Sequence, residues 1–421
     1  MRILVVGRGG REHAIVWALK KSNRVRQIYC APGNAGIAQL AECVPIGELD
    51  FESLSRFALD HAVDLVVVGP DDPLSEGIVD YMEKRGIPVF GPRKNAAILE
   101  GSKAFTKQLL KKYNIPTADF ETFDRYEDAL AYVRRNGAPI VVKADGLAAG
   151  KGVVVARTLD EAEQALKRIM VDKAFGKSGE RVVIEQFMQG QEMSILSFVD
   201  GAVVRPMVPS QDHKPAFDGD RGPNTGGMGT YAPLPHIPQS VIDEAIETII
   251  RPTAEAMVKE GRPFRGVLYA GLMITPEGPK TVEFNARFGD PEAQVVLPLL
   301  ETDLVDIMLA TLNGRLGDMD IRWSDEAAVC VIMASSGYPG GYEKGFPIEG
   351  LDQVRDSIVF HAGTAARDGT IVTNGGRVLG VTARGANIAE ARAKAYADVA
   401  RIRFHGAHYR TDIAQKALQN G

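Results

Sequence analysis

The first hundred residues alternate short apolar runs with helical patterns, and this alternation constrains the fold more than any other feature. Apolar runs occupy residues 2–7, 25–31, 63–69 and 87–91, and helical patterns follow the first two of them. Strand–helix units repeated in this order form parallel sheets with helices on both faces. The sequence therefore predicts an α/β fold that begins with a doubly wound parallel-sheet domain over residues 1–101.

The rest of the chain divides into three further parts. A helix and turn at residues 102–122 leave the first domain, and residues 190–328 contain a glycine-rich segment, a long helix and a hairpin. Between them, residues 123–189 have the order helix, strand, glycine-rich loop, strand, helix and strand. Residues 329–421 open with an apolar strand and end with a helical pattern. We expect a central domain in two segments, a compact inserted domain, and a small separate α/β cap at the C-terminus.

Composition and cysteine usage exclude several classes of protein. The 421 residues are 45% hydrophobic and 24% charged, as in ordinary globular proteins. A formal net charge of −5 argues against a nucleic-acid binder that relies on a basic surface. No apolar run approaches the ~20 residues of a membrane helix. The first apolar run breaks into glycine, so we interpret it as a strand and not as a signal peptide. Cys30, Cys43 and Cys330 are odd in number and lack metal-site spacing, which favours a reducing cytoplasm.

The stretch DGLAAGKGVVVA, residues 145–156, is similar to a phosphate-binding loop without matching one. A Walker A loop has the form G-x-x-x-x-G-K-[ST] and opens a helix. Here Gly146 and Gly150 are one residue too close, Gly152 stands where a hydroxyl is needed, and the valines that follow favour a strand. The preceding PIVVKAD favours a strand too, so the loop is predicted to join two strands. Two interpretations remain open: a structural hairpin, or a flexible flap whose backbone N–H groups cover phosphates.

The segment VEFNARFGDPEAQ places a carboxylate, an amide and a guanidinium at alternate positions of a predicted strand. Side chains of a strand alternate between faces, so Glu283, Asn285 and Arg287 are expected on one face, with Val282 and Phe284 on the other. Carboxylate and amide oxygens suit magnesium, which keeps part of its coordination for phosphates. The alternative is an exposed polar face at a sheet edge, which the apolar flanks of the hairpin disfavour.

Two lysines and two carboxylates elsewhere are candidate ligands for an anionic nucleotide. Lys143 lies in an otherwise apolar strand, where a cation is costly unless it meets an anion. Lys103 follows Ser102 at a helix start, where the helix dipole disfavours a positive charge. Glu185 ends a strand and Glu192 follows a turn, positions from which carboxylates can contact adenine and ribose. Each of these residues taken alone is also compatible with an ordinary structural role.

In this order, the lysines, the glycine-rich loop, the acidic residues and the Glu-x-Asn strand resemble the ATP-grasp ligases. The closer resemblance is to the glycinamide ribonucleotide synthetase family. The stretches that carry it are GRGGREHA, APGNAG, VGPDDPL, KADGLAAGKGV, QDHKPAFDGDRGPNTGGMG and RFGDPEAQ, and it continues through GGRVLGV and YRTDIA over nearly the whole chain. The resemblance implies an ATP-grasp fold with residues 102–122 and 190–328 as the central catalytic domain. Residues 123–189 would be the lid, and 329–421 a C-terminal domain.

The resemblance also implies ligands for ATP and for a metal ion. The residues implied in ATP binding lie in the central domain and the lid, and they are Lys103, Lys143, Gly146, Gly150, Lys151, Gly152, Glu185, the Phe187 main chain and Glu192. Glu283 and Asn285 correspond to ligands of Mg²⁺ or Mn²⁺. Many relatives add an acid on the preceding strand, whereas VLYAGLM has none here, which leaves the number of metal ions open.

Glycine and 5-phosphoribosylamine are the other substrates that the resemblance implies. Asp212 and Arg287 are the residues expected around glycine and the reacting groups. The residues expected at 5-phosphoribosylamine come from the first domain, and they are Gly9, Gly10, Arg11, Glu12, Asn34 and Asp71. Arg8 stands where relatives often have a smaller residue.

The implied activity is ATP-dependent ligation of glycine to 5-phosphoribosylamine through a glycyl phosphate, in de novo purine biosynthesis. The flap would close over the acyl phosphate and keep water out. The expected partners are small molecules, with no nucleic acid and no membrane, and the protein is expected to be a monomer or a weak oligomer.

Three other functions compete with this one. Another ATP-grasp ligase that joins a carboxylate to an amine would use the same nucleotide site. A non-catalytic nucleotide-binding module would not need the Glu283, Asn285 and Arg287 face. The glycine-rich turn after the first strand also suggests an NAD-dependent dehydrogenase, because such turns bind dinucleotide phosphates. NAD sites usually carry an acid about 20 residues further on, whereas this chain has Cys30-Ala31-Pro32-Gly33 there.

Overall fold

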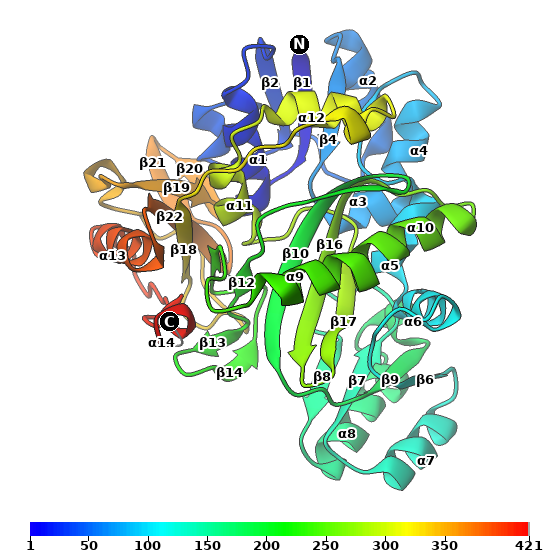
Figure 1. Cartoon of the computed structure of the whole chain (residues 1–421). Helices are drawn as coiled ribbons and strands as arrows, with labels where there is room; N and C mark the ends of the chain where they lie inside the picture. Colours follow the sequence, from blue (N-terminus) through cyan, green and yellow to red (C-terminus); the bar gives the residue numbers. More distant parts are fainter. Residues whose placement is uncertain (420–421) are drawn as a thin grey trace.

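The computed structural model describes residues 1–419, and its first unit is a parallel sheet flanked by helices (Figure 1). The five strands run in the order β3-β2-β1-β4-β5, and every neighbouring pair is parallel. The strands are β1 (Arg2–Gly7), β2 (Gln27–Pro32), β3 (Glu42–Cys43), β4 (Leu65–Val68) and β5 (Val89–Phe90). The helices are α1 (Gly10–Lys20), η1 (Ile37–Gln39), α2 (Phe51–Asp60), α3 (Asp71–Glu76), α4 (Ile78–Glu83) and α5 (Lys94–Gly101). The predicted doubly wound domain is confirmed.

The strands of this sheet are apolar throughout because both faces are covered. Leu4 and Val6 of β1 lie in one core with residues of α2, α4 and α5. Ile3 and Val5 lie in a second core with residues of α1 and of α12 (Leu304–Leu312). A parallel strand buried on both faces has a continuous apolar run and not an alternating one.

The second unit is a four-stranded antiparallel sheet at the end of the molecule opposite the first unit (Figure 1). In the order β6-β9-β7-β8, its strands are β6 (Phe120–Phe123), β9 (Val182–Gln186), β7 (Ile140–Ala144) and β8 (Val153–Ala156). Its helices are α7 (Tyr126–Asn136), α8 (Leu159–Leu166), η2 (Lys167–Val171) and η3 (Gly176–Gly179). These elements have a hydrophobic core of their own. β6 spans the expected boundary between residues 122 and 123, and it pairs with β9 in this sheet.

A long antiparallel sheet occupies the centre of the molecule (Figure 1). Its strands, in the order β11-β10-β16-β17, are β11 (Val203–Pro206), β10 (Gln191–Asp200), β16 (Arg265–Thr275) and β17 (Gly278–Asn285). One face shares a core with α9 (Gln239–Ala245), η4 (Ile246–Ile250) and α10 (Arg251–Lys259), and the other with α11 (Ala293–Leu299), α12 and η5 (Leu316–Asp318). The helix α6 (Lys103–Lys112) connects the first unit to the four-stranded sheet of the second unit. The predicted long helix and hairpin are confirmed.

The C-terminal unit shares its sheet with the central segment, so the expected separate cap is wrong in this respect. The sheet order is β12 (Gln211–Asp212), β15 (Gly229–Ala232), β18 (Ala327–Ala334), β22 (Arg377–Gly385) and β19 (Ser357–His361). The other elements are β13 (Pro215–Phe217), β14 (Arg221–Asn224), β20 (Thr364–Arg367), β21 (Thr370–Thr373), η6 (Leu351–Gln353), α13 (Ile388–Val399) and α14 (Gln415–Gln419). β12 and β15 are short and lie on either side of a glycine-rich stretch, so the pattern of polar and apolar residues does not predict them as strands.

Two further findings concern the chain as a whole. Within residues 1–419, no helix has the length and apolar character needed to cross a membrane. The cysteines Cys30, Cys43 and Cys330 are all free thiols.

Candidate active site

The glycine-rich loop is fixed at both ends and exposed in the middle. β7 and β8 pair antiparallel, so the loop joins two strands as predicted. The Gly146 N–H donates to the Ser178 carbonyl at 3.1 Å, and the Ser178 hydroxyl donates to the Leu147 carbonyl at 2.7 Å. At the other end, the Gly152 carbonyl accepts from the Ala144 N–H at 2.8 Å. Residues 149–151, including Gly150 and Lys151, are exposed. The Lys151 N–H donates to the Ala148 carbonyl at 2.9 Å and closes the turn, so the exposed backbone at Ala149 and Gly150 is the part that is open to a ligand.

Lys103 lies at the base of this loop. Ser102 caps helix α6, because its side chain accepts from the Phe105 N–H, and Lys103 is the first residue of the helix. The Lys103 ammonium donates to the Gly146 carbonyl at 3.2 Å. Burial lowers the pKa of Lys103, and the nearby Glu283 carboxylate opposes that shift. A partly desolvated cation next to exposed backbone N–H groups is a favourable place for phosphate oxygens.

Lys143 belongs to a buried triad that the sequence analysis missed in part. Its ammonium lies 2.9 Å from one oxygen of Glu185, and the other oxygen lies 3.2 Å from the Lys107 ammonium. All three side chains are 3–4% exposed. Lys143 also donates to the Val282 carbonyl at 3.2 Å, and Lys107 donates to the Thr117 hydroxyl at 2.6 Å. Burial lowers the pKa of Lys107 to about 8, against the charge of Glu185. Lys107 lies one helical turn after Lys103, and this spacing is the sequence signal that could have identified it.

Glu192 lies beside a second lysine that the sequence analysis did not single out. The Lys214 ammonium is 3.4 Å from the Glu192 carboxylate, and the Gln211 amide donates to the Glu192 carbonyl at 2.7 Å. The charge of Glu192 raises the pKa of Lys214 in spite of burial. Burial raises the pKa of Asp212 to about 7, although Lys214 opposes this shift. This corner therefore holds a carboxyl that exchanges a proton near neutral pH.

A β-bulge interrupts the strand that carries Glu283 and Asn285. Gly271 pairs with Glu283, whereas Leu272 pairs with Thr281, so Val282 is an extra residue. Val282 and Glu283 are both half-buried, so the bulge breaks the predicted alternation at Val282. From Glu283 onward the burial alternates as predicted, with Asn285 and Arg287 half-buried and Phe284 and Ala286 buried. Burial acts to raise the pKa of Glu283, but the cations of Lys214, Lys143 and Lys103 outweigh it and lower that pKa. Glu283 is therefore an ionised carboxylate among three ammonium groups.

The donor set at this bulge suits a hard cation. Glu283 carries a carboxylate and Asn285, two residues further along β17, carries an amide oxygen, and both are donor types that a hard cation accepts. In the described part of the chain, no group of three or more His, Cys, Asp or Glu side chains is arranged to hold a metal ion. Magnesium typically takes one or two protein oxygens and completes its shell with phosphate and water. The pair therefore fits a cation that is bound together with a nucleotide.

Arg287 lies beyond the end of β17 and pairs with an acid that the sequence analysis missed. Its guanidinium is 2.9 Å from the Glu100 carboxylate, which also accepts from the Ala286 N–H at 2.8 Å. Burial raises the pKa of Glu100 to about 7, and Arg287 opposes this shift. Burial acts to lower the pKa of Arg287, but the charges of Glu100 and Asp71 outweigh it and raise that pKa. Arg287 thus lies where the first unit meets the central sheet.

Glu12 fills the turn between β1 and α1. One carboxylate oxygen accepts from the Gly9 N–H at 2.7 Å, and the other accepts from the Arg11 guanidinium at 2.7 Å. The side chain is 1% exposed and lies against Gly7 and Gly69, where a Cβ atom would collide with it. A carboxylate therefore already occupies the N-terminus of α1, where a dinucleotide phosphate would have to bind. This arrangement disfavours the dehydrogenase.

Asn34, Gly10 and Phe187 complete the set of predicted residues. The Asn34 amide donates to the carbonyls of Arg8 and His361, each at 2.8 Å, and its oxygen accepts two backbone N–H groups of the same loop. This side chain shapes the loop between the first and C-terminal units. Gly10 is the first residue of α1. Phe187 follows β9, and its ring lies 4.6 Å from the guanidinium carbon of Arg157.

One further carboxylate lies near Asp212. Glu292 accepts from the Tyr269 hydroxyl at 3.0 Å, and that hydroxyl is 2.8 Å from the hydroxyl of Ser194. Burial raises the pKa of Glu292. Glu292 falls within RFGDPEAQ, so the motif was recognised from sequence but this residue was not singled out.

A central antiparallel sheet, an exposed glycine loop on a separate small sheet, and lysines whose charges act on an ionised carboxylate define an ATP-grasp ligase. Such an enzyme uses ATP together with a divalent metal ion. Comparison with known families agrees. The models of phosphoribosylglycinamide synthetase match in three consecutive parts: the N domain over residues 1–100, the ATP-grasp (A) domain over 101–293 and the C domain over 328–416. The chain belongs to the phosphoribosylglycinamide synthetase family.

Similar proteins cover the whole chain. The phosphoribosylamine–glycine ligase of Caldanaerobacter subterraneus is 53% identical over 414 residues, which are 98% of this chain and 99% of that protein. That of Halalkalibacterium halodurans is 50% identical over 99% of this chain and 97% of its own length. The crystal structure of the Thermotoga maritima phosphoribosylamine–glycine ligase has a TM-score of 0.86 at 37% identity, covering 98% of this chain and all of that one. A biotin carboxylase domain from Hydrogenobacter thermophilus, 17% identical, shares the fold with a TM-score of 0.72 over 97% of this chain and 91% of its own.

Proposed function

We propose that this site joins glycine to 5-phosphoribosylamine by way of glycyl phosphate, with ATP converted to ADP and phosphate. The ligase activity and its place in purine biosynthesis follow from membership of the family. The observation that carries the proposed mechanism is the ionised Glu283 among Lys103, Lys143 and Lys214, next to a glycine loop with an open backbone.

The nucleotide would lie between the central sheet and the small sheet. Lys103, Lys143 and the backbone of Gly146, Gly150, Lys151 and Gly152 contact its phosphates in this proposal, and the Glu192 carboxylate contacts the ribose. The Glu185 carboxylate already meets two lysines. We therefore assign the adenine edge to the main chain at Glu185 and Phe187, and the Glu185 side chain to holding Lys143 in place.

Glu283 and Asn285 would hold Mg²⁺ or Mn²⁺. A bound cation of this kind neutralises phosphate oxygens and orients the γ-phosphate. Glu283 contributes an ionised oxygen without needing to lose a proton, because the surrounding lysines lower its pKa. Lys103 and Lys143 add positive charge on the other side of the phosphates, so that the glycine carboxylate and the triphosphate can approach each other.

The reaction would take place in two steps. A glycine carboxylate oxygen attacks the γ-phosphorus, the bond to the β-phosphate oxygen breaks, and ADP leaves. The amine of 5-phosphoribosylamine then attacks the acyl carbon, phosphate leaves, and the new amide nitrogen loses a proton. Arg287 is assigned to the glycine carboxylate and the developing phosphoryl charge. Asp212, with a pKa of about 7, is suited to accept the proton.

The first unit would bind 5-phosphoribosylamine. We assign this substrate to the turn of Gly9, Gly10, Arg11 and Glu12 and to Asp71, whose charge raises the pKa of Arg287, with Asn34 shaping the neighbouring loop. The functional parts are then residues 1–101 for this substrate, 102–122 with 190–328 for catalysis, 123–189 as the lid, and 329–421 as the C-terminal domain. We further propose a cytoplasmic monomer or weak oligomer with small-molecule partners.

The test is the substrate dependence of ADP release. With ATP and Mg²⁺ present, ADP is measured with glycine, with 5-phosphoribosylamine, with both and with neither. Fast release should require both, because an acyl phosphate without an amine to trap it is unproductive. Gly9→Leu should lose turnover while still binding ATP, because a Cβ atom there would lie 2.9 Å from the Glu12 carboxylate and would displace the turn assigned to 5-phosphoribosylamine. ADP release that ignores both substrates contradicts the proposal, and reduction of NAD⁺ would revive the dehydrogenase.

A further inference from the structure

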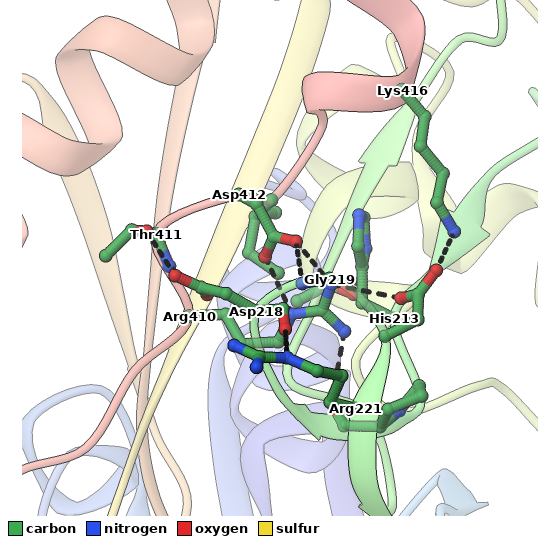
Figure 2. A network of polar contacts seen from close by, with 12 residues as sticks. His213, Asp218, Gly219, Arg221, Arg410, Thr411, Asp412 and Lys416 are labelled. Atoms are coloured by element: carbon green, nitrogen blue, oxygen red, sulfur yellow. Dashed lines mark hydrogen bonds and ion pairs between the residues drawn. The ribbon is translucent and has the colours of Figure 1, made fainter.

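A C-terminal arm, residues 410–416, lies across the segment that carries Asp212 and Lys214 (Figure 2). The arm is held on its own unit by α13. The Tyr396 hydroxyl donates to the Arg410 carbonyl at 2.6 Å, and the Arg392 guanidinium donates to the Thr411 carbonyl at 2.6 Å. The arm is therefore fixed at its base, and its side chains reach over the neighbouring segment, residues 211–221.

Arg410 is the centre of this contact. Its side chain is fully buried, and its guanidinium binds the Asp412 carboxylate through two hydrogen bonds of 2.8 Å. The same guanidinium donates to the Pro215 carbonyl at 3.1 Å and to the Asp220 carboxylate at 3.0 Å. A buried guanidinium is tolerated only where its N–H groups are paired, and its planar fork fixes the positions of the groups it pairs with. Pro215 directly follows Lys214, so this contact fixes the backbone on one side of that lysine.

Other contacts of the arm fix the segment at further points. Figure 2 shows Asp218 and Gly219 facing the arm: the Thr411 N–H donates to Asp218 at 2.8 Å, and the Gly219 N–H donates to Asp412 at 2.9 Å. The Ala414 N–H donates to Nε2 of His213 at 3.3 Å. His213 precedes Lys214, so the arm contacts the side chain of the residue before this lysine and, at Pro215, the carbonyl of the residue after it.

The Lys214 side chain contacts the nucleotide site and not the arm. Its ammonium lies 3.4 Å from Glu192, and the Gln211 amide binds the Glu192 carbonyl at 2.7 Å. An ammonium on a flexible stem can leave a half-exposed carboxylate unless its backbone is fixed. Thr225 binds the Lys214 carbonyl through its N–H and its hydroxyl, and the arm adds the contacts to the His213 side chain and the Pro215 carbonyl. The position of Lys214 against Glu192 therefore depends in part on the Pro215 backbone, which Arg410 holds.

We propose that Arg410 is a positioning residue for nucleotide binding: through the backbone at Pro215 it keeps the Lys214 ammonium against Glu192. This inference rests on the proposed function, because it takes Glu192 as the acid at the ATP ribose. It goes beyond that function by giving the C-terminal arm a role in a site to which the arm contributes no side chain.

The first test compares Arg410→Gln with the wild-type full chain. The dissociation constant of Mg²⁺–ATP, measured by calorimetry, should rise about tenfold, whereas KM for 5-phosphoribosylamine should stay within about twofold. Arg410→Lys keeps the charge without the planar fork, and its Mg²⁺–ATP dissociation constant should lie between those of the wild type and Arg410→Gln. An unchanged ATP dissociation constant in folded Arg410→Gln overturns the inference.

The matched control is Arg401→Gln. Arg401 pairs with the fully buried Asp398 at 2.6 Å in the same unit, and its guanidinium also donates to the Ala397 carbonyl at 3.2 Å, so both partners lie in α13 and not in the segment 211–221. Both variants remove a guanidinium from a carboxylate, so both should lower the unfolding temperature. Only Arg410→Gln should weaken ATP binding. Equal weakening in both variants would mean a general loss of stability and would contradict the positioning role.

A double-variant comparison shows whether Arg410 acts through Lys214. Lys214→Met alone should weaken ATP binding, and adding Arg410→Gln to it should weaken binding no further, within about twofold. Additive losses would contradict the inference. If Arg410→Gln does not fold, Asp220→Asn replaces it, because Asp220 is a direct partner of the Arg410 guanidinium. The Asp220 side chain is 39% exposed and its φ of 54° is one that Asn adopts, so this variant should fold. A rise of about threefold supports the inference and no rise overturns it.

Failure of the proposed function gives a different result. Lys143→Met should abolish measurable ATP binding if Lys143 contacts the phosphates. If Lys143→Met binds ATP normally, the nucleotide site itself is misplaced. If Lys143→Met loses ATP while Arg410→Gln and Asp220→Asn bind it like wild type, the site stands and the role of the arm is wrong.

Discussion

The Glu185 carboxylate lies 2.9 Å from the Lys143 ammonium in a buried pair, and Lys107 contacts its other oxygen. Removing one partner from a buried pair leaves an uncompensated charge, which typically costs about 3–5 kcal/mol. Glu185→Gln leaves two ammonium groups without their shared carboxylate. We expect it to lower the free energy of unfolding by that amount, measured by urea denaturation.

Glu192→Gln is the control for this prediction. Glu192 also pairs with a lysine, Lys214, but its side chain is 44% exposed. An exposed pair contributes at most about 1 kcal/mol, so this variant should unfold almost like the wild type. If the two variants lose equal unfolding free energy, the buried ion pairs of Glu185 with Lys143 and Lys107 are not as strongly coupled as their burial indicates.

Glu100 should make stability depend on pH in a definite direction. Burial raises its pKa from 4.5 to about 7 in the folded protein, so the folded state binds more protons than the unfolded state between these values. The stability that Glu100 contributes is therefore present below pH 4.5 and is lost as pH rises through 7. Over this range the loss is about 3 kcal/mol, from ~1.4 kcal/mol per pKa unit.

Glu100→Gln removes this titration and leaves the other groups in place. As pH rises from 4.5 to 8, the unfolding free energy of the wild type should fall relative to that of the variant. Denaturant unfolding at several pH values measures it. Parallel curves for the two proteins would show that Arg287 keeps Glu100 ionised and that its pKa is not raised.

Patterns that depend on local sequence were predictable, and contacts between distant segments were not. The strand–helix alternation predicted the parallel sheet because both faces of each strand are apolar. The Ser102 cap and the strand-to-strand glycine loop were predictable because capping and β-branched runs act locally. The β-bulge at Val282 was not, since one extra residue leaves no mark in the pattern of polar and apolar residues.

The site residues divide in the same way. Lys143 was predicted because a lysine in an apolar strand is unusual. Lys107 and Lys214 were missed because each looks like an ordinary surface lysine until the fold places it against Glu185 or Glu192. The sharing of one sheet by β12, β15 and β18 was missed for the same reason: the pairing partners are about a hundred residues apart.

The glycine loop should differ in its response to substitution at its end and at its centre. A Cβ atom at Gly146 would lie 2.9 Å from the Ser178 Cα atom, so Gly146→Ala must displace the loop from its anchor. A Cβ atom at Gly150 would have no neighbouring atom within 4 Å outside the adjoining residues, so only the φ of 73° opposes a side chain there. Gly146→Ala should raise the ATP dissociation constant by about tenfold, and Gly150→Ala by about threefold or less.

Amide exchange gives an independent measurement of the same loop. Exchange at residues 148–151 should slow when ATP and Mg²⁺ are added, because ligand contacts replace solvent at an exposed turn. Exchange at Gly146, which is already hydrogen-bonded to Ser178, should change less. Slow exchange at 148–151 without nucleotide, unchanged on addition, would identify a rigid hairpin and contradict the flap.

Glu283→Gln should keep the fold and lose most turnover. Glu283 is ionised because Lys214, Lys143 and Lys103 lower its pKa, and a neutral amide is a poorer ligand for a hard cation. Removing a group that stabilises phosphoryl charge typically costs on the order of 100-fold in kcat. Part of this loss should be recovered as Mg²⁺ is raised, since a weaker site fills at higher concentration.

The matched control is Glu277→Gln at the turn of the same hairpin, where the side chain is 76% exposed and pairs with Lys280. The control should show wild-type turnover at every Mg²⁺ concentration, and near-normal activity of Glu283→Gln at low Mg²⁺ would remove Glu283 from the metal site.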